Sequence, residues 1–276
     1  MSAPAPLRLR PLEIGDLLDE TFRMYRRHFV LFAGISIALS IPLAVLSGGY
    51  AAFAEGLLQT ASGGAGNPAA FEGAILSFSV GLLLTLVFVP FSYSALTYAA
   101  CESALGRTVT AGGMLSGVLR RYFQLLGYWL LIGLMFSVGI CLFPLWTWIG
   151  VGWVAVVPAM FIENIGLAAA MGRSWRLVEG RWWRTFFIVF LMLVVFYITR
   201  IALTAFIYAA QQLLNLAISS YLVLTISSAA DTIVAALVNP VPQIAMVLIY
   251  FDLRVRREAL DLFQIAQRVR SPLPSS

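Results

Sequence analysis

The chain has 276 residues, of which 61% are hydrophobic and only 11% are charged. Soluble domains carry about 25% charged residues, so this composition excludes an ordinary soluble protein. The net charge is +5 and the mean hydropathy is +0.89, whereas a disordered chain needs low hydrophobicity. The class that remains is an all-α, polytopic membrane helical bundle, and all 18 of its basic residues are arginines.

The N-terminal segment, residues 1–28, is polar and charged and predicts a cytoplasmic interfacial helix. One helical face carries apolar residues at steps of three and four, namely Ile14, Leu18, Phe22, Tyr25 and Phe29. Acidic residues come early in this segment and arginines late, which complements the helix dipole. The segment has no central apolar run, so we expect no cleavable signal peptide and a retained first span.

The first four spans are predicted between residues 29 and 162. A bilayer core of about 30 Å needs about 20 apolar helical residues, and segments 29–50 and 73–100 each provide them. The stretch 122–162 carries no charge and would form a helix of about 60 Å, twice the bilayer core. It must therefore fold back, and Pro144 marks the predicted turn between spans three and four.

Spans five and six are predicted at 185–210 and 221–250, on either side of a polar loop at 211–220. Pro240 and Pro242 lie inside span six. Proline removes a backbone donor and clashes with the preceding helical turn. We therefore expect these two prolines to kink or split span six.

The arginines are distributed unevenly among the connecting segments. All except Arg200 lie in residues 1–28, 101–121, 166–184 or 251–276. Six spans place these four segments on one face of the membrane, as the positive-inside rule requires. The sequence thus predicts a six-helix transmembrane domain at 29–250, with both termini cytoplasmic.

The cytoplasmic segments share a pattern, in which an amphipathic stretch ends in arginines and aromatic residues before a span. After residues 1–28 the pattern returns weakly at 110–122 and more clearly at 164–180, where Asn164 is expected to cap a helix and Gly180 to end it. Two interpretations stay open, an internal repeat and the basic, aromatic flanks of any cytoplasmic helix end.

Eight arginines of these segments are candidates for contacts with anionic lipid headgroups, although topology alone also explains them. They are Arg26, Arg27, Arg120, Arg121, Arg173, Arg176, Arg181 and Arg184. Residues 251–276 are expected to form a cytoplasmic helical extension and a tail. Opposite charges four residues apart support this helix, in the pairs Asp252–Arg256, Arg254–Glu258 and Arg257–Asp261.

Arg200 and Asp231 are the only charged residues between 185 and 251. Each lies about ten residues from the outer end of its span, which corresponds to a depth of about 15 Å, near the bilayer middle. A lone arginine at that depth costs about 2.5–3.5 kcal/mol, so an ion pair between spans five and six is expected. The pair is interpreted either as structural or as a polar site for a solute or a proton path.

The sequence shows no constellation of catalytic or metal-binding residues. Cys101 and Cys141 are too far apart in sequence to indicate a metal site, and neither a metal nor another cofactor is expected. His28 is the sole histidine and is expected to act as an aromatic at headgroup level, while Glu163 is expected to pair with a loop arginine. Acidic residues interleave with the arginines, so no basic stripe for nucleic acid is present.

Three runs carry a family resemblance, "PLEIGDLLDETFRMYRRHFVLF", "AAAMGRSWRLVEGRWWRTFF" and "IYFDLRVRREALDL". They resemble the membrane domain of some bacterial glycerophosphoryl diester phosphodiesterases, a domain also found in stand-alone proteins. The likeness covers about residues 11–263 and is most specific at 172–177 and 250–256. It implies a location in the bacterial inner membrane.

The resemblance does not extend to the phosphodiesterase activity. In that family the chemistry belongs to a separate barrel domain, which needs more than about 200 residues and has paired histidines and metal-binding carboxylates. Here His28 is followed by phenylalanine, so the His-Arg-Gly pattern of the catalytic domain is absent. The resemblance therefore implies a stand-alone membrane domain without the catalytic barrel.

Two functions remain open from the sequence. The first is a scaffold or accessory membrane domain linked to glycerophosphodiester or lipid metabolism. The second is a small transporter or lipid-handling protein that uses Arg200 and Asp231 beside the helix break at Pro240 and Pro242. Membrane lipids are the expected partners in both, whereas a protein partner and the oligomeric state are left open.

Overall fold

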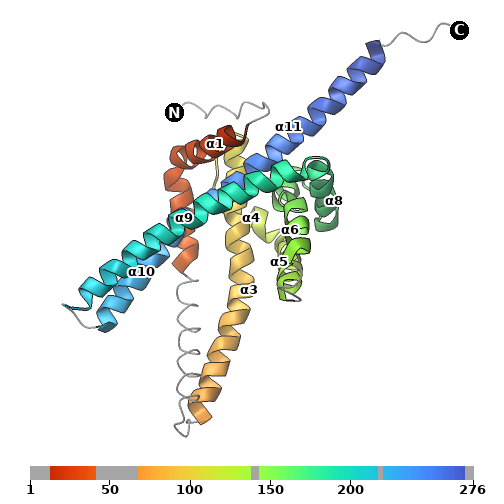
Figure 1. Ribbon diagram of the computed structural model, residues 1–276. Coiled ribbons are helices and arrows are strands. Elements are labelled where there is room, and N and C mark those ends of the chain that lie inside the picture. The colour runs from red at the N-terminus through yellow and green to blue at the C-terminus, as the bar shows by residue number, and fades with distance from the viewer. Residues whose placement is uncertain (1–12, 42–67, 138–142, 217–219, 271–276) are drawn as a thin grey trace, which may run out of the picture.

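The computed structural model describes residues 13–41, 68–137, 143–216 and 220–270. Within these ranges every regular element is a helix and no strand is present, which confirms the all-α class. The helices, shown in Figure 1, are α1 (Ile14–Arg27), an unlabelled helix (Phe29–Ile41), α3 (Pro68–Ala104), α4 (Ala111–Leu119), α5 (Tyr122–Ser137), α6 (Phe143–Gly152), α7 (Val156–Ile162), α8 (Leu167–Val178), α9 (Trp182–Leu214), α10 (Ser220–Val238) and α11 (Pro240–Arg270).

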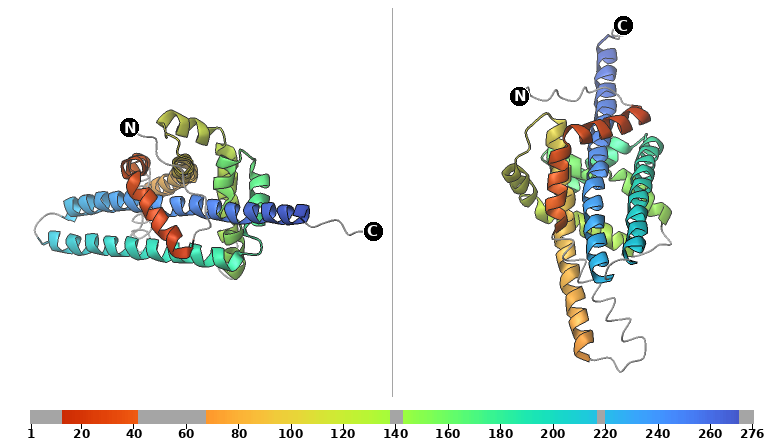
Figure 2. Two further views of the ribbon diagram at one scale, coloured as in Figure 1. Left: turned by 90° about the horizontal axis from the view of Figure 1, so that it is seen from above. Right: turned by 90° about the vertical axis from the view of Figure 1, so that its left-hand side faces the viewer.

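Helix α11 forms the centre of the packing. It contacts α1, α3, α7, α8 and α9, and it continues almost in line from α10 (Figures 1 and 2). Helix α9 runs antiparallel along α10 and the first part of α11, while α3 crosses this pair. The largest fully buried side chains come from several of these helices and include Leu17, Phe32, Leu125, Met160 and Tyr250.

Among the described residues, four helical segments are long and apolar enough to cross a bilayer, namely Phe78–Ala104, Pro144–Ile162, Trp182–Leu214 and Ala229–Glu258. They agree with predicted spans two, four, five and six and support a multi-pass membrane protein. Spans one and three correspond to shorter apolar helices, Phe29–Ile41 and Tyr122–Met135. The second half of predicted span one, residues 42–50, lies outside the described residues.

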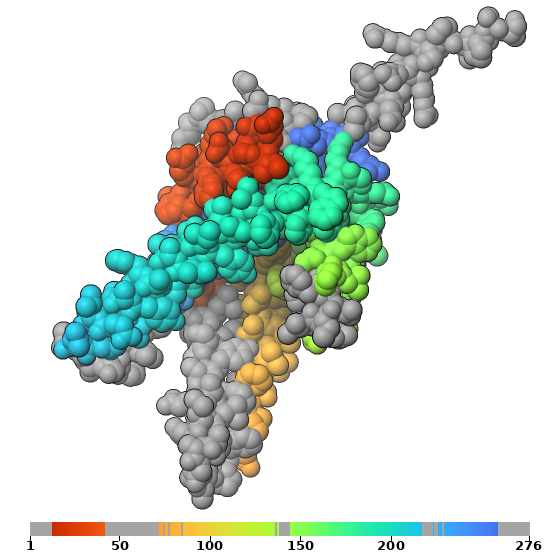
Figure 3. All heavy atoms as spheres, in the orientation of Figure 1, coloured from red at the N-terminus to blue at the C-terminus, as the bar shows by residue number. Residues whose placement is uncertain are grey.

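Helix α9 presents its apolar side chains on the outside of the molecule (Figure 3). Its exposed large hydrophobic residues include Phe187, Phe190, Tyr197, Ile198, Ile201 and Phe206. Such a surface would be unfavourable in water but costs nothing against lipid tails, which are equally apolar. The exterior of α9 is therefore that of a lipid-facing helix.

The fourth predicted span is divided, which the sequence analysis did not anticipate. Helix α6 ends at Gly152 and α7 begins at Val156. Pro158 explains the interruption, because it has no N–H and its ring clashes with the carbonyl of Val154 in a continuous helix. The predicted turn at Pro144 is also misplaced, since Pro144 lies in the first turn of α6 and any turn before it falls in residues 138–142, outside the described residues.

The predicted break in span six is confirmed. Helix α10 ends at Val238, and Pro240 is the first residue of α11, where a missing N–H leaves no hydrogen bond unmade. Pro242 lies in the same first turn. The hydroxyl of Tyr25 in α1 donates a hydrogen bond to the carbonyl of Leu237 at 2.6 Å, which ties the N-terminal helix to this break.

Helix α1 buries one face in the protein, beside the apolar face that was predicted to lie on the membrane surface. Leu17, Thr21 and Met24 are buried in the protein, and α1 packs on α11. Phe22 and Phe29, members of the predicted apolar face, are instead exposed. The apolar residues at steps of three and four thus lie beside the buried face of α1. Contact of these residues with the membrane surface remains a prediction.

The ends of α8 agree only partly with the sequence. Gly180 has a φ of +79° directly after the helix, as expected for the glycine that ends it. The residue that precedes the helix is Gly166 and not Asn164. Asn164 instead adopts a left-handed conformation with a φ of 56°, and its side chain is used in a contact with Arg121 described below.

Candidate functional sites

Arg200 and Asp231 form an ion pair between α9 and α10. Nη2 of Arg200 lies 2.8 Å from Oδ2 of Asp231. Thr204, one turn after Arg200, completes the arrangement: its Oγ1 accepts from Nη1 of Arg200 at 2.8 Å and lies 3.3 Å from Oδ1 of Asp231. The sequence analysis missed Thr204, although its spacing of four residues from Arg200 on the same helix was a usable signal.

The three side chains of this unit satisfy one another's polar atoms. Both terminal nitrogens of Arg200 and both carboxylate oxygens of Asp231 have a partner within the unit. The side chains remain 24% and 41% exposed, respectively, at the surface of the helix pair. The arrangement therefore joins α9 to α10 by mutual neutralisation, which lowers the cost of placing either charge in an apolar medium.

A second cluster of charges joins α7, α8 and α11. Glu163, at the end of α7, accepts hydrogen bonds from Nε of Arg173 at 2.8 Å and from the hydroxyl of Tyr250 at 2.8 Å. Nη2 of Arg173 also reaches Glu258 at 2.8 Å, and Arg254 binds the same carboxylate. Burial lowers the pKa of Arg173, but its hydrogen bonds to Glu163 and Glu258 outweigh this and raise the pKa above its ordinary value.

Asp252 links α9 to α11 in a third cluster. Its side chain is only 1% exposed and lies between Nη1 of Arg184 at 2.6 Å and Nε of Arg256 at 2.9 Å. The predicted pair Asp252–Arg256 is thus present, as is Arg254–Glu258. The side chain of Asp261 lies outside the described residues, and Arg257 is instead 3.7 Å from Glu179.

The eight candidate lipid-contacting arginines divide into two groups. Arg173 and Arg184 are held in the ion pairs above, Arg181 donates to the carbonyl of Arg256 at 3.5 Å, and Arg121 donates to the carbonyl of Ile165 at 2.6 Å and to the side chain of Asn164. The exposed members, which remain available to headgroups, are Arg26, Arg27, Arg120 and Arg176.

These contacts bring distant segments to one end of the molecule, which we call the charged end. It contains Arg121, Glu163, Arg173, Arg184 and Asp252. The contact of Arg121 with Ile165 is informative, because the apolar stretch 122–162 leaves and returns between these two residues. The two ends of this apolar stretch therefore both lie at the charged end, as expected for the predicted helical hairpin.

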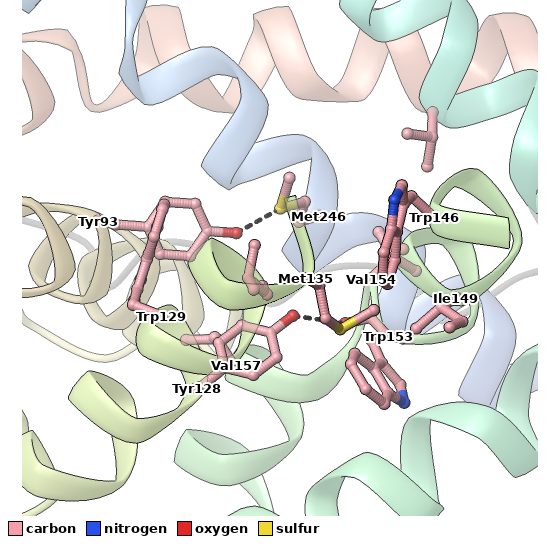
Figure 4. Close-up of a pocket in the computed structure, with 13 residues that line it drawn as sticks. Tyr93, Tyr128, Trp129, Met135, Trp146, Ile149, Trp153, Val154, Val157 and Met246 are labelled. Atoms are coloured by element: carbon pink, nitrogen blue, oxygen red, sulfur yellow. Dashed lines mark hydrogen bonds between the residues drawn. The ribbon is translucent and has the colours of Figure 1, made fainter. Parts of the chain in front are cut away.

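An apolar pocket of about 340 Å³ lies between α3, α5, α6, α7, α9 and α11 (Figure 4). Its wall is mostly aromatic and aliphatic, with Tyr93, Tyr128, Trp129, Ile132, Met135, Trp146, Ile149, Gly150, Trp153, Val154, Val157, Val189 and Met246. The hydroxyl of Tyr93 donates to the sulfur of Met246 at 2.6 Å, and that of Tyr128 to the carbonyl of Trp153 at 3.3 Å. Both hydroxyls are therefore satisfied, whereas the buried Nε1 of Trp129 has no hydrogen-bond partner. The pocket suits a ligand that is mostly apolar.

A larger, polar hollow of about 540 Å³ lies beside α4. Arg120, Arg121 and Glu102 line it together with Tyr98 and Ser116. Helix α4 approaches α3 closely here, because a Cβ on Gly117 would lie 2.6 Å from the ring of Tyr98. This hollow holds charges of both signs and so shows no clear preference for an anion.

The part of the chain that the structure describes contains neither a cluster of metal-binding residues nor an accessible cysteine. No group of three or more His, Cys, Asp or Glu residues there could hold a metal ion. Cys101 is buried in α3 as a free thiol, and Cys141 lies outside the described residues. The ring of His28 packs edge-on against Phe32, and burial, together with the charge of Arg27, lowers the pKa of His28.

Comparison with known proteins adds no relative to this picture. No protein-family model, no curated protein and no solved structure matches the chain. Any function must therefore be argued from the residues and their arrangement.

The ion pair between α9 and α10 gives a first test. Replacing Asp231 by asparagine leaves the guanidinium of Arg200 without its carboxylate, and we expect a loss of about 1–3 kcal/mol in stability. The double variant with Arg200→Gln should recover most of that loss. Thermal unfolding in one detergent measures both, and Thr204→Val serves as a milder control. A double variant no more stable than Asp231→Asn alone would show that the pair contributes nothing.

Proposed function

We propose that the chain is a non-catalytic domain of the bacterial inner membrane that serves as a scaffold or accessory subunit. It crosses the membrane six times, and both termini and the charged end lie in the cytoplasm. The resemblance of its sequence to the membrane domain of glycerophosphoryl diester phosphodiesterases connects it with glycerophosphodiester or lipid metabolism. Membrane lipids are its partners, with anionic headgroups meeting the exposed arginines.

The observation that supports this proposal most strongly is the mutual satisfaction of the acidic residues. Glu163, Asp252 and Glu258 each bind arginines from another helix or from the next turn. A general acid or base must meet a substrate, whereas these carboxylates face the arginines that neutralise them. They fix the relative positions of α7, α8, α9 and α11, which is a structural role and not a catalytic one.

The six crossings are supported by the position of Arg121. Four crossings alone, those of the long helices, would place residues 105–143 on the opposite side of the membrane from residues 163–181. Arg121 nevertheless hydrogen-bonds to Ile165 and Asn164. A further crossing by Tyr122–Met135 returns residues 105–121 and 163–181 to the same side. A crossing by Phe29–Ile41 places the N-terminal arginines there as well, which satisfies the positive-inside rule.

A lipid-handling function is the second candidate, and a different observation favours it. The apolar pocket of about 340 Å³ has the size and lining of a small-ligand site between bundle helices. Arg200 and Asp231, the expected centre of such a site, line neither this pocket nor the hollow beside α4. A lipid chain would therefore occupy the aromatic pocket, away from the ion pair.

The topology is tested with reporters. A reporter that is active only in the cytoplasm should be active when fused after Ser276 and inactive when inserted in residues 51–72. The reason is that an even number of crossings separates the two chain ends, while the first loop faces outward. Reporter activity in whole cells, normalised to protein level, provides the measurement. Activity of a periplasm-specific reporter at either terminus contradicts the proposal.

The non-catalytic function is tested in liposomes. Purified protein reconstituted into liposomes should neither hydrolyse glycerophosphodiesters nor take them up faster than empty liposomes do, because its carboxylates are occupied. A soluble phosphodiesterase added to the same sample checks that product is detectable. Turnover or uptake that is present in the wild type and lost in Glu163→Gln or Asp231→Asn overturns the scaffold proposal.

Filling the apolar pocket tests the second candidate. Ile132 lines the pocket, whereas Leu134 on the same helix is 63% exposed and does not line it. If the pocket holds a lipid chain, Ile132→Trp should reduce the lipid retained through purification and Leu134→Trp should not. Native mass spectrometry counts the retained lipids. Equal retention in both variants rules out a lipid in this pocket.

A further inference from the structure

A third pocket, of about 270 Å³, is built around three tryptophans near the charged end. Trp148 comes from α6, Trp175 from α8 and Trp182 from the start of α9, and Glu179 completes the wall with Gly152, Val178 and Gly180. The rings of Trp148 and Trp175 stand nearly perpendicular, with centroids 4.7 Å apart and an interplanar angle of 83°. Three tryptophans and one acidic residue, whose side chain is 64% exposed, thus line a single space.

Backbone geometry holds the tryptophans in place. Trp175 lies directly on the backbone of α6, where a Cβ on Gly152 would be only 2.5 Å from its ring. The positive φ of Gly180 turns the chain after α8, so that Trp182 returns to the same pocket. Nε1 of Trp182 donates to the carbonyl of Trp148 at 3.1 Å. Each indole therefore has a specific constraint on its position.

Trp148 is 47% exposed and reaches the molecular surface, but anchoring at the membrane surface does not account for the position of Trp175. A tryptophan of the interfacial belt lies at the lipid boundary, as Trp183 does with 68% of its surface exposed. Trp175 instead points inward against Gly152 and Trp148. The adjacent Trp182 and Trp183 contact each other edge to face, with centroids 5.0 Å apart, but only Trp182 lines the pocket.

The chemistry of the pocket selects a cation. Indole faces attract cations through the ring quadrupole, and aromatic cages of this kind recognise quaternary ammonium groups. Glu179 adds a negative charge. Arg257 lies 3.7 Å from its carboxylate and donates to its backbone carbonyl at 3.1 Å, and an exposed ion pair of this length contributes little. A compact metal ion would gain little from the indoles, whereas a trimethylammonium group offers a large, weakly hydrated surface to all three.

We propose that the pocket formed by Trp148, Trp175, Trp182 and Glu179 binds a trimethylammonium group. The group is carried either by a free choline-type cation or by the headgroup of a phospholipid. The proposal depends on neither the number of crossings nor the scaffold function, because it rests only on the local contacts of α6, α8 and α9.

The test uses the full-length protein in a maltoside detergent without choline. Titration with choline should give saturable binding by calorimetry and a change in tryptophan fluorescence. The neutral isostere 3,3-dimethylbutanol should not bind, because it lacks the charge that the indoles attract. Nanodiscs of phosphatidylcholine and of phosphatidylglycerol distinguish the sources: a lipid site is occupied only in the first, so added choline then binds more weakly.

Three variants test whether choline binds in this pocket and not elsewhere on the protein. Trp175→Leu should weaken choline binding by about tenfold or more, since cation–π contacts in a desolvated site are of that strength. Glu179→Gln, at an exposed position that does not threaten folding, should weaken it several-fold, and Trp183→Leu should leave it unchanged. Absence of saturable choline binding, equal binding of the neutral isostere, or an equal loss in Trp183→Leu overturns the proposal.

Discussion

The carboxylate of Asp252, almost completely buried, is the constraint on which the charged end depends. A buried carboxylate without partners costs several kcal/mol, so Asp252 requires both Arg184 and Arg256. Arg184 belongs to the first turn of α9, and Asp252 lies in α11. Their contact therefore sets the position at which α9 leaves the charged end, and Glu163 and Arg173 fix α7 and α8 to the same helix.

Features that depend on neighbouring residues were predictable from the sequence. The split at Pro240, the helix end at Gly180 and the pairing of Arg200 with Asp231 all follow from local chemistry or from helix length. Pro158 gives the same local signal for a helix interruption as Pro240 does. The sequence analysis did not use it, because the uninterrupted apolar character of 122–162 suggests two uniform spans. Asn164 was misassigned, since its side chain serves Arg121 and not a helix end.

Contacts between distant segments could not be predicted. Tyr250 and Glu258 reach Glu163 and Arg173 across more than 80 residues, as the spacings of 87 and 85 residues show. Apart from the pairs four residues apart on one helix and the isolated pair Arg200–Asp231, nothing in the sequence states which of the 18 arginines meets which acid. The tryptophan pocket is of the same kind, because its three indoles come from three helices and only the close approach at Gly152 brings them together.

Helix α11 is uninterrupted over 31 residues, from the break beside Tyr25 and Leu237 to Arg270. Its far end projects away from the body of the molecule, as Figure 1 shows. An α-helix of this length is about 46 Å long. The ion pairs of Asp252 and Glu258 lie near its midpoint, so the last 12 residues, roughly 18 Å of helix, carry the C-terminal segment clear of them.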